Sequence, residues 1–579
     1  MLCLLRKLLS KLCNPHSTMV VESNSPHDDD SPSIEQLEDD FRRLTLDEKF
    51  PEPSTRHPHA IFILPPELLG TIFTTVCHAD FHKFHSDKNR HNKTTAFTLG
   101  QICREWRDIV WSTPAIWSYV FLCLSLTRYD AQIKLLEGWL NRSGICPLSL
   151  NFVFQNEEDW SNKEPPIELI SLLSSSSYRW RLINVVIPEG WYQALNEIKH
   201  NIPILADVST QPLWSDCGLP PSRRKRFTLF KYAPVLKNIH LNGYYLSDVS
   251  IPWGQLRHVT LQHVYLDECF FGLSKSPDMT MCRIYTILKN DVGRVVIESK
   301  IRLSLLEEMV FFSSLWEDTE RLFSHLTTPL LHTLEFSTPQ DDLDFSKIPP
   351  LLLQSGSRLL KLKLDAFTFT CDEVELLELL CNIPTLQKVE IAMKADSIPI
   401  SNLFIDLLKL QPSSSTGANV DNLPPSPIPY FLPNLEMFTF SGPVDAPPGF
   451  SDLLLGVLRL RRNLTPGTSD RGPFPFFWLD IKTDTNYSFI LLAETKDKLQ
   501  KLVDDGLHLS VVFNGDSWLW ICLPISSAPS RIEWSVVDIL EHRVFNSSSI
   551  HPWNKAIIYS RFIHCIWCRF RPLPCHSNS

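Results

Sequence analysis

The stretch Pro384-Thr385-Leu386-Gln387-Lys388-Val389-Glu390-Ile391 carries the pattern that decides the fold of this 579-residue chain. A leucine is followed by aliphatic residues three and five positions later, with polar residues between them. This alternation predicts a short strand that buries one face. The pattern recurs at Leu182-Val185-Ile187, Leu236-Ile239-Leu241, Leu256-Val259-Leu261, Leu306-Met309-Phe311, Leu331-Leu334-Phe336, Leu359-Leu362-Leu364 and Leu435-Phe438-Phe440.

The copies are separated by one or two units of about 25 residues, which is within the period of leucine-rich repeats. Each unit predicts one strand and a covering helix, such as residues 372–381 or 403–410. Stacked units would bury one continuous core. We therefore expect an α/β fold, an irregular leucine-rich-repeat-like solenoid with a parallel sheet on its concave side. An unrelated α/β domain with several parallel strands is the alternative.

The residues between the inward-facing positions should project from the opposite face of this sheet. They are Lys237, Asn238, His258, Thr260, His332, Glu335, Lys361, Lys363, Lys388 and Glu390. Mixed polar and charged groups suit a reversible, selective contact with another protein. Lys361, Lys363 and Lys388 are the candidate target-binding residues.

Residues 61–117 have a different pattern, which predicts three short amphipathic helices. Pro65 and Pro66 suit the first turn of a helix, where a missing N–H costs nothing. A second helix is predicted from Thr98, and Thr113 is expected to cap a third. The apolar positions of the three helices are Leu68, Leu69, Ile72, Phe73, Leu99, Ile102, Cys103, Trp106, Ile109, Val110, Ile116, Trp117 and Val120. So small a group buries little surface alone, and we expect it to need a partner.

This stretch resembles an F-box. The segments that follow it strengthen the resemblance: residues 136–144 (LEGWLNRSG), 147–150 (PLSL) and 175–180 (SSSYRW) resemble the same region of fungal F-box proteins. The resemblance implies docking on a Skp-family adaptor, and through it on a cullin-RING ubiquitin ligase. It places the adaptor contact on Leu64, Pro65, Leu68, Ile72, Leu99, Ile102 and Trp106. The connection between the first two helices, residues 78–94, is longer than is usual in the family.

The rest of the chain divides around these two regions. We expect a disordered acidic tail over residues 1–58, the F-box over 59–125, the repeat region over 126–540 and an irregular tail over 541–579. Further elements are predicted as helices at 129–140, 453–462 and 498–503, as strands at 147–154 and 508–513, and as a flexible loop at 412–433. The leucine-rich first thirteen residues suggest either a weak amphipathic membrane contact or a frayed end.

Composition excludes several classes of protein. The net charge of −10 gives no basic footprint for nucleic acid, and no apolar run reaches the roughly 18 residues of a membrane-spanning helix. The 15 cysteines lack the paired spacing of a disulfide framework, so we interpret those with aliphatic neighbours, such as Cys103, Cys123, Cys371 and Cys381, as reduced core thiols of a cytosolic or nuclear protein.

Residues that could carry chemistry are sparse. A loop with His78, His82, His85 and His91, and a Cys565-x-x-Cys568 pair followed by Cys575-His576, lack the frame or spacing of a zinc site. The basic run at 223–226 fits a solvated loop better than a nuclear import signal. Nucleophile-elbow, phosphate-loop, zinc-protease and dinucleotide motifs are missing.

We therefore expect a non-catalytic protein without metal or cofactor. Its expected role is that of a substrate receptor, which binds the adaptor at one end and an unknown target protein on the repeats. The alternatives are a repeat-based scaffold that binds a partner without degradation and, less favoured, a cryptic α/β hydrolase.

Overall fold

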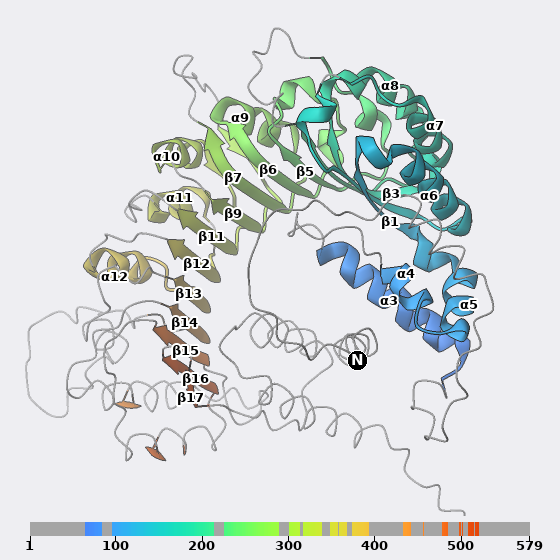
Figure 1. The fold of residues 1–579 in the computed structure, drawn as a ribbon. Coiled ribbons are helices and arrows are strands. Elements are labelled where there is room, and N and C mark those ends of the chain that lie inside the picture. The colour runs from blue at the N-terminus through green and yellow to red at the C-terminus, as the bar shows by residue number, and fades with distance from the viewer. Residues whose placement is uncertain are drawn as a thin grey trace, which may run out of the picture. The chain divides into compact units, whose positions relative to one another are not determined.

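The structure is a computed structural model, and it describes residues 64–83, 95–161, 163–213, 225–288, 300–312, 316–338, 348–356, 358–366, 373–392, 432, 434–441, 455–456, 478–483, 497–498, 501, 508–513 and 516–519. The chain divides into two compact units, Met1–Leu360 and Lys361–Ser579. Both contain a parallel sheet, so the fold is mixed α/β (Figure 1).

In the first unit the strands lie side by side in the order of the chain, and each is parallel to the next. They are β1 Tyr119–Leu124, β2 Leu148–Phe154, β3 Trp180–Ile187, β4 Asp207–Pro212, β5 Asn238–Asn242, β6 His258–Tyr265, β7 Met281–Leu288, β9 Glu308–Phe312 and β11 Thr333–Thr338. Two short strands, β8 Ile301–Arg302 and β10 Leu326–Thr327, pair separately.

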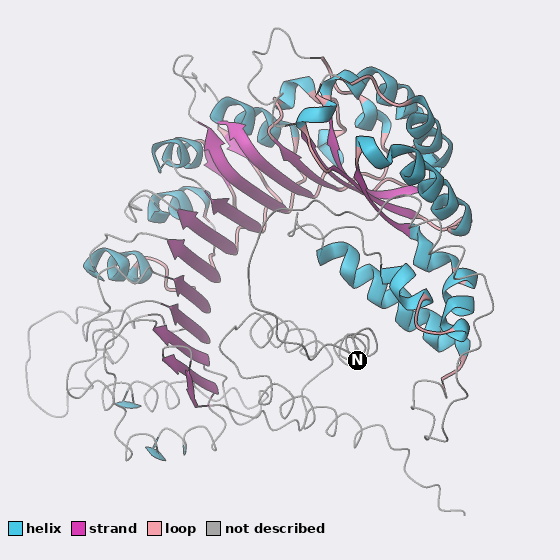
Figure 2. Ribbon diagram, in the orientation of Figure 1, coloured by secondary structure: helices cyan, strands magenta, loops and turns pink. Residues whose placement is uncertain are grey.

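The helices that connect these strands lie over one face of the sheet (Figure 2). They are α6 Tyr129–Arg142, α7 Ile167–Ser176, α8 Tyr192–Asn196, α9 Leu266–Lys275, α10 Trp316–Ser324 and α11 Ile348–Ser355, with short 3-10 turns between them. The opposite face of the sheet is called the open face below. Before β1 the chain forms α3 Pro66–Lys83, α4 Thr95–Gly100, α5 Arg104–Ser112 and the 3-10 helix η2 Pro114–Ser118.

The second unit repeats the arrangement. Its strands β12 Lys361–Ala366, β13 Lys388–Ala392, β14 Met437–Ser441, β15 Trp478–Thr483 and β16 His508–Phe513 are parallel neighbours, and β17 Asp516–Leu519 is antiparallel to β16. The helix α12 Glu373–Cys381 lies between β12 and β13.

The core consists of the repeated apolar positions. In every predicted copy from Leu236 to Phe440, the leucine and the two apolar residues after it are at most 7% exposed. Successive copies pair in register, for example Ile239 with Val259 and Leu241 with Leu261. The strand pattern read from the sequence is therefore confirmed for these copies.

Two of the three double-length gaps between predicted copies each contain a strand that the pattern missed, and most of the third, between Leu386 and Leu435, lies outside the described residues. Strand β4 has Leu205 and Val208 in the buried positions but Thr210 in the third, where its hydroxyl lies 3.0 Å from the Tyr244 hydroxyl. In β7, Cys282 and Ile284 occupy the buried positions. The sequence pattern missed both units because Thr210 replaces an aliphatic residue in the first, and Met279 and Cys282 replace the leucine and an aliphatic residue in the second.

The first predicted copy is two residues out of register. Ile183 pairs with Val208, which pairs with Ile239, so Ile183 rather than Val185 holds the second position of the repeat, and the buried Trp180 holds the position of the leucine. Leu182 and Val185 are only half-buried, whereas Ile187 is buried as expected. Because a strand alternates its faces with a period of two, Leu182, one residue from Ile183, lies on the opposite face.

The predicted helices before β1 need three corrections. Helix α3 continues to Lys83, so the expected 78–94 connection is helical in its first part. The helix predicted from Thr98 is broken into α4 and α5, and the Cys103 thiol caps α5 by accepting a hydrogen bond from the Trp106 N–H at 3.4 Å. Thr113 does not cap η2, because its hydroxyl donates back to the Ile109 carbonyl at 2.7 Å.

The other predicted elements fall into two groups. Those at 129–140, 147–154, 372–381 and 508–513 are confirmed as α6, β2, α12 and β16. The tails at 1–58 and 541–579, the helix at 403–410, and most of 412–433, 453–462 and 498–503 lie outside the described residues.

None of the described cysteines forms a disulfide, but only some of them are core thiols. Cys77, Cys269 and Cys282 are buried, whereas Cys103 and Cys123 are partly exposed and Cys381 is exposed at the end of α12, contrary to expectation. Cys371 lies outside the described residues.

Candidate functional site

The helices before β1 form a small cluster with its own aromatic centre. Phe73 of α3, Leu99 of α4 and Trp106 of α5 are at most 3% exposed. The rings of Phe73 and Trp106 lie 4.7 Å apart. Residues at the helical spacing of the sequence therefore include side chains buried inside this cluster as well as side chains on its surface.

The residues expected to contact the adaptor separate into two groups. Pro65 is exposed, Leu68 is 51% exposed, and Leu64, Ile72 and Ile102 are half-buried. Leu99 and Trp106 are enclosed in the cluster, so the expectation that they contact a partner directly is corrected. Periodicity could not separate the two groups, because both sides of a short helix in so small a cluster carry apolar residues.

A shallow groove lies beside the start of α3, and the sequence reasoning missed it. It is lined by Pro66, Arg104, Glu105, Asp108, Ile109 and Ser112. The residues Arg104, Asp108 and Ser112 follow one another at four-residue spacing on α5, which is the signal that could have revealed a common face. The groove thus combines charged groups with the exposed apolar start of α3.

Tryptophan side chains pack the cluster against helix α6, which follows the first strand of the sheet. Trp117 of η2 is fully buried, and its Nε1 donates to the Val110 carbonyl at 2.8 Å. Its ring lies 5.2 Å from that of Trp111 and 6.3 Å from that of Trp139, which belongs to α6. The Arg142 guanidinium of α6 lies 5.0 Å above the Trp117 ring.

This packing corrects the argument that the cluster needs an external partner to bury its surface. Helix α6 belongs to the sheet region and supplies part of the missing core within the same chain. The exposed side chains at the start of α3, rather than the small size of the cluster, are therefore what indicates a partner.

A second contact reaches the open face of the sheet. Tyr119 of β1 lies 5.1 Å from the His78 ring and 5.6 Å from the Phe81 ring of α3, measured between ring centres. Burial raises the pKa of the Tyr119 hydroxyl, and the nearby Arg181 guanidinium opposes that shift. The end of α3 and the end of α6 thus hold the cluster from two directions.

Residues 141–144 (NRSG) and 175–180 (SSSYRW) are joined by hydrogen bonds of one arginine. The Arg179 guanidinium, which is buried, donates to the Ser143 hydroxyl at 3.0 Å, to the Leu140 carbonyl at 3.2 Å and to the Gly144 carbonyl. Gly144 has a φ of 54°, the left-handed conformation that ends helices. Arg179 therefore caps the C-terminal end of α6 and links the two segments.

The open face of β4–β6 carries a network of neutral polar side chains. His240 lies between Ser209 and Gln262, at 3.3 Å from each. The Asn242 amide donates to Gln211 at 2.9 Å. Burial lowers the pKa of His240, so the imidazole is neutral near pH 7. As expected, the polar residues of these strands lie on the face opposite the core.

The structure brings together the three lysines expected to bind a target. Lys361 of β12 pairs with Lys388 of β13 in the strand register, and Lys363 pairs with Glu390. The Lys361 ammonium, however, lies 3.0 Å from the Glu390 carboxylate. An exposed ion pair of this kind is weak, but it offsets part of the positive charge that the sequence suggested.

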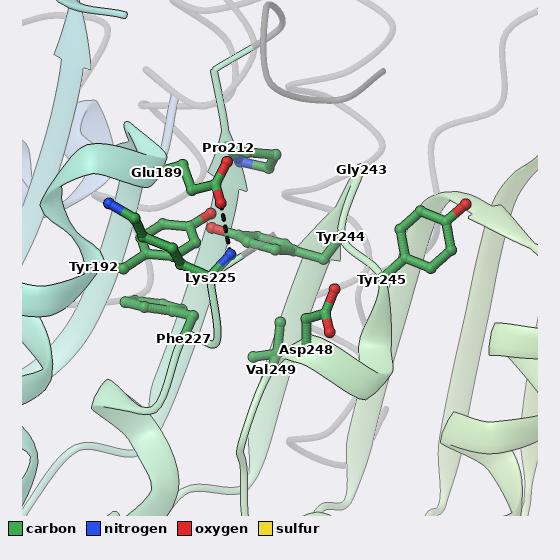
Figure 3. A pocket seen from close by; sticks show the side chains of 10 residues that line it. All are labelled: Glu189, Tyr192, Pro212, Lys225, Phe227, Gly243, Tyr244, Tyr245, Asp248 and Val249. Carbon is green, nitrogen blue, oxygen red and sulfur yellow. Dashed lines mark hydrogen bonds between the residues drawn. The ribbon is translucent and has the colours of Figure 1, made fainter. Parts of the chain in front are cut away.

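A small cavity lies at the end of β4 and β5 where the strands stop (Figure 3). It is lined by Glu189, Tyr192, Pro212, Lys225, Phe227, Gly243, Tyr244, Tyr245, Asp248 and Val249. The Glu189 carboxylate accepts a hydrogen bond from the Lys225 backbone N–H at 2.6 Å. The cavity volume of about 20 Å³ has room for a water molecule but not for a substrate.

Most of the residues that the sequence analysis weighed as metal ligands lie outside the described residues. His78 and His82 lie in α3, while His85, His91 and the C-terminal cysteines lie outside the described residues. Within the described ranges, no three His, Cys, Asp or Glu side chains are grouped as metal ligands would be. Of the basic run, Lys225 and Arg226 are described and exposed.

Comparison with known proteins adds no family. No protein-family model matches the chain, and no curated protein is similar to it. None of the helices that the structure describes has the length and apolar character needed to cross a membrane.

Proposed function

We propose that this chain is the substrate-receptor subunit of a Skp-cullin-F-box ubiquitin ligase. In this proposal α3, α4, α5 and η2 form the F-box, and the successive parallel strands with their covering helices form a leucine-rich-repeat-like solenoid. The observation that carries the proposal is the exposed apolar start of α3, with Pro65 and Leu68 on its surface. This helix precedes the first strand of a sheet that the described connecting helices cover on one face only.

The exposure of Leu68 supports an interface at this place. The neighbouring Leu69 is fully buried, so Leu68 is not needed for the core of the cluster. Leu64 and Ile72 add half-buried apolar surface next to it, and a contiguous apolar surface with a polar rim is typical of protein contacts. The adaptor contact is therefore proposed on Leu64, Pro65, Leu68, Ile72 and Ile102.

Such a receptor performs no covalent chemistry itself. It raises the effective concentration of a target near the ubiquitin-conjugating enzyme that the cullin carries. This role requires that the adaptor surface and the target surface keep a defined separation. Within the first unit, the packing of Trp117 against Trp139 and of α3 against Tyr119 holds the proposed F-box against the first strands of the sheet.

The target is proposed to bind on the open, polar side of the strands, including Lys361, Lys363 and Lys388. No metal or cofactor enters this function, and the chain would act in the cytosol or the nucleus.

Leu68→Glu tests the adaptor contact. We expect this variant to lose co-purification with a recombinant Skp adaptor, because it places a charge at a central apolar anchor. The matched control is Leu135→Glu on α6, where a leucine is 36% exposed away from the proposed contact. Both variants should unfold at the wild-type temperature. Equal adaptor recovery by the two variants would contradict the F-box assignment.

A second experiment separates a degradative receptor from a scaffold. A receptor should co-purify with both the adaptor and a cullin, and a protein bound to it should turn over only when the cullin is neddylated. Charge reversal at Lys361 and Lys363 should reduce recovery of that protein, more strongly at low salt, without changing adaptor recovery. Stable binding without turnover would favour the scaffold.

A further inference from the structure

The open face has an unusual backbone conformation in the adjacent strands β6 and β7. His263 in β6 and Thr286 in β7 have φ values of 50° and 61°. Gln262 pairs with Tyr285 and Val264 with Ile287, so the two left-handed residues lie side by side. Such a backbone is unfavourable for histidine and more so for a β-branched threonine, and strained positions of this kind cluster at binding sites.

The paired bends change what the sheet presents. In each strand two consecutive residues face away from the core, Gln262 with His263 and Tyr285 with Thr286. The chain then turns back, and Val264 and Ile287 are buried again. The open face gains an extra row of side chains here without any loss of core.

Two aromatic pairs flank this row. The rings of Tyr245 and Tyr265 lie 5.1 Å apart and tilted by 36°, and those of Tyr285 and Phe312 lie 6.3 Å apart and tilted by 43°. Figure 3 shows that Tyr245 points away from the small cavity beside it. All four rings are half-buried. Among the described residues, the Tyr265 and Tyr285 hydroxyls have no hydrogen-bond partner. We call these four rings, with Gln262, His263 and Thr286, the bend patch.

The bend patch carries no formal charge. It contains no acidic or basic side chain apart from His263, whose pKa is lowered by burial. His263 Nδ1 lies 2.8 Å from the Asn242 amide oxygen, which can only accept, so Nδ1 holds the proton. Beside the patch, Arg283 and Glu308 neutralise one another at 3.2 Å. A charged partner would therefore lose its hydration here without gaining an opposite charge.

We infer that the bend patch binds an uncharged, extended peptide segment of the target, with its apolar side chains against the ring pairs. The Gln262 amide and the two tyrosine hydroxyls supply both donors and acceptors, as the backbone of an extended peptide requires. Because the two rings of each pair are tilted against each other, they offer apolar surface to aliphatic side chains but no single flat face on which a sugar could stack. This inference rests on the proposed function, since it specifies the chemistry of the target.

The probes are fluorescent nine-residue Ser/Gly peptides whose fourth and sixth positions carry Leu, Phe, Asp or Lys. In an extended peptide those two side chains point to the same side. Fluorescence polarisation with the purified full-length chain should show binding of the Leu and Phe peptides. Binding should not change between about 50 and about 500 mM NaCl, because no charge pair contributes.

The double variant Tyr265→Ala/Tyr285→Ala should bind these peptides at least about tenfold more weakly. Tyr178→Ala, which removes a 50% exposed ring elsewhere, is the matched control and should bind as wild type. Thr286→Gly keeps the bend but frees the backbone, and should weaken binding without lowering the unfolding temperature.

Three results would overturn the inference: no binding by the apolar peptides, equal binding by the Asp or Lys peptides, or equal loss in the control. Binding of maltoheptaose in place of the peptides would assign the patch to carbohydrate instead. Adaptor co-purification is measured on the same preparations. Its failure would remove the ligase role while leaving the peptide result intact.

Discussion

Replacing Arg179 with methionine tests the cap that joins the NRSG and SSSYRW segments. Methionine keeps the volume of the buried side-chain stem, so the change removes mainly the guanidinium. We expect the first unit to lose about 2 to 4 kcal/mol of unfolding free energy.

The magnitude follows from the three acceptors. The Leu140 carbonyl keeps a hydrogen bond from the Ser143 hydroxyl at 2.8 Å. The Ser143 hydroxyl, which is fully buried, would lose the donor that Arg179 provides, and such a loss costs about 1 to 3 kcal/mol. Gly144 is exposed, so its carbonyl can accept from water instead. The favourable cation at the C-terminal end of α6 contributes up to about 2 kcal/mol more. Relief from burying a guanidinium offsets part of this loss.

Urea unfolding followed by tryptophan fluorescence measures the effect, because Trp139 and Trp180 are buried close to the cap along the chain. Arg226→Met is the control, since Arg226 is exposed, and it should change the free energy by less than about 0.5 kcal/mol. If Arg179→Met behaves like this control, the cap does not hold α6 and the structural explanation of both segments fails.

The other predictions concern the core, the cluster and pH. Leu362→Asp should make the purified chain insoluble, because it buries an unpaired charge at a fully enclosed position; Lys363→Asp, on the other face of the same strand, should remain soluble. Gly100→Ala should cost about 1 to 3 kcal/mol in thermal unfolding, because the new methyl would lie 2.3 Å from Trp111 Cζ3; an unchanged midpoint would show that Trp111 moves freely. The pKa of His240 is lower in the folded chain than its ordinary 6.5, so the unfolded chain binds the proton first and stability should fall as the pH drops below about 6.5. His240→Gln should flatten that decline in unfolding measurements across this range, and an identical pH profile would exclude His240 as its source.

Much of the fold was predictable because the strands have a short and regular local signal. Leu334, Leu362 and Val389 each sit where the alternation of the sequence places them, fully buried. The units of β4 and β7 escaped because Thr210 and Cys282 fill core positions, and only the neighbouring strands reveal them. Leu182 was assigned the leucine position that Trp180 occupies two residues earlier, and only the pairing with the neighbouring strands reveals this.

The candidate adaptor site shows the same division more sharply. The sequence by itself determined that a helix begins at Pro65 and Pro66 and that Leu68 and Leu69 are adjacent on it. Only the tertiary structure decided that Leu69 is enclosed while Leu68 is exposed, and that Leu99 and Trp106 are core residues. Periodicity records that a residue is apolar, whereas exposure depends on what packs against it. For Trp106 that neighbour is Phe73 of α3, whose ring lies 4.7 Å away. The left-handed backbone of His263 and Thr286 likewise left no signal in the sequence, because these residue types seldom adopt that conformation.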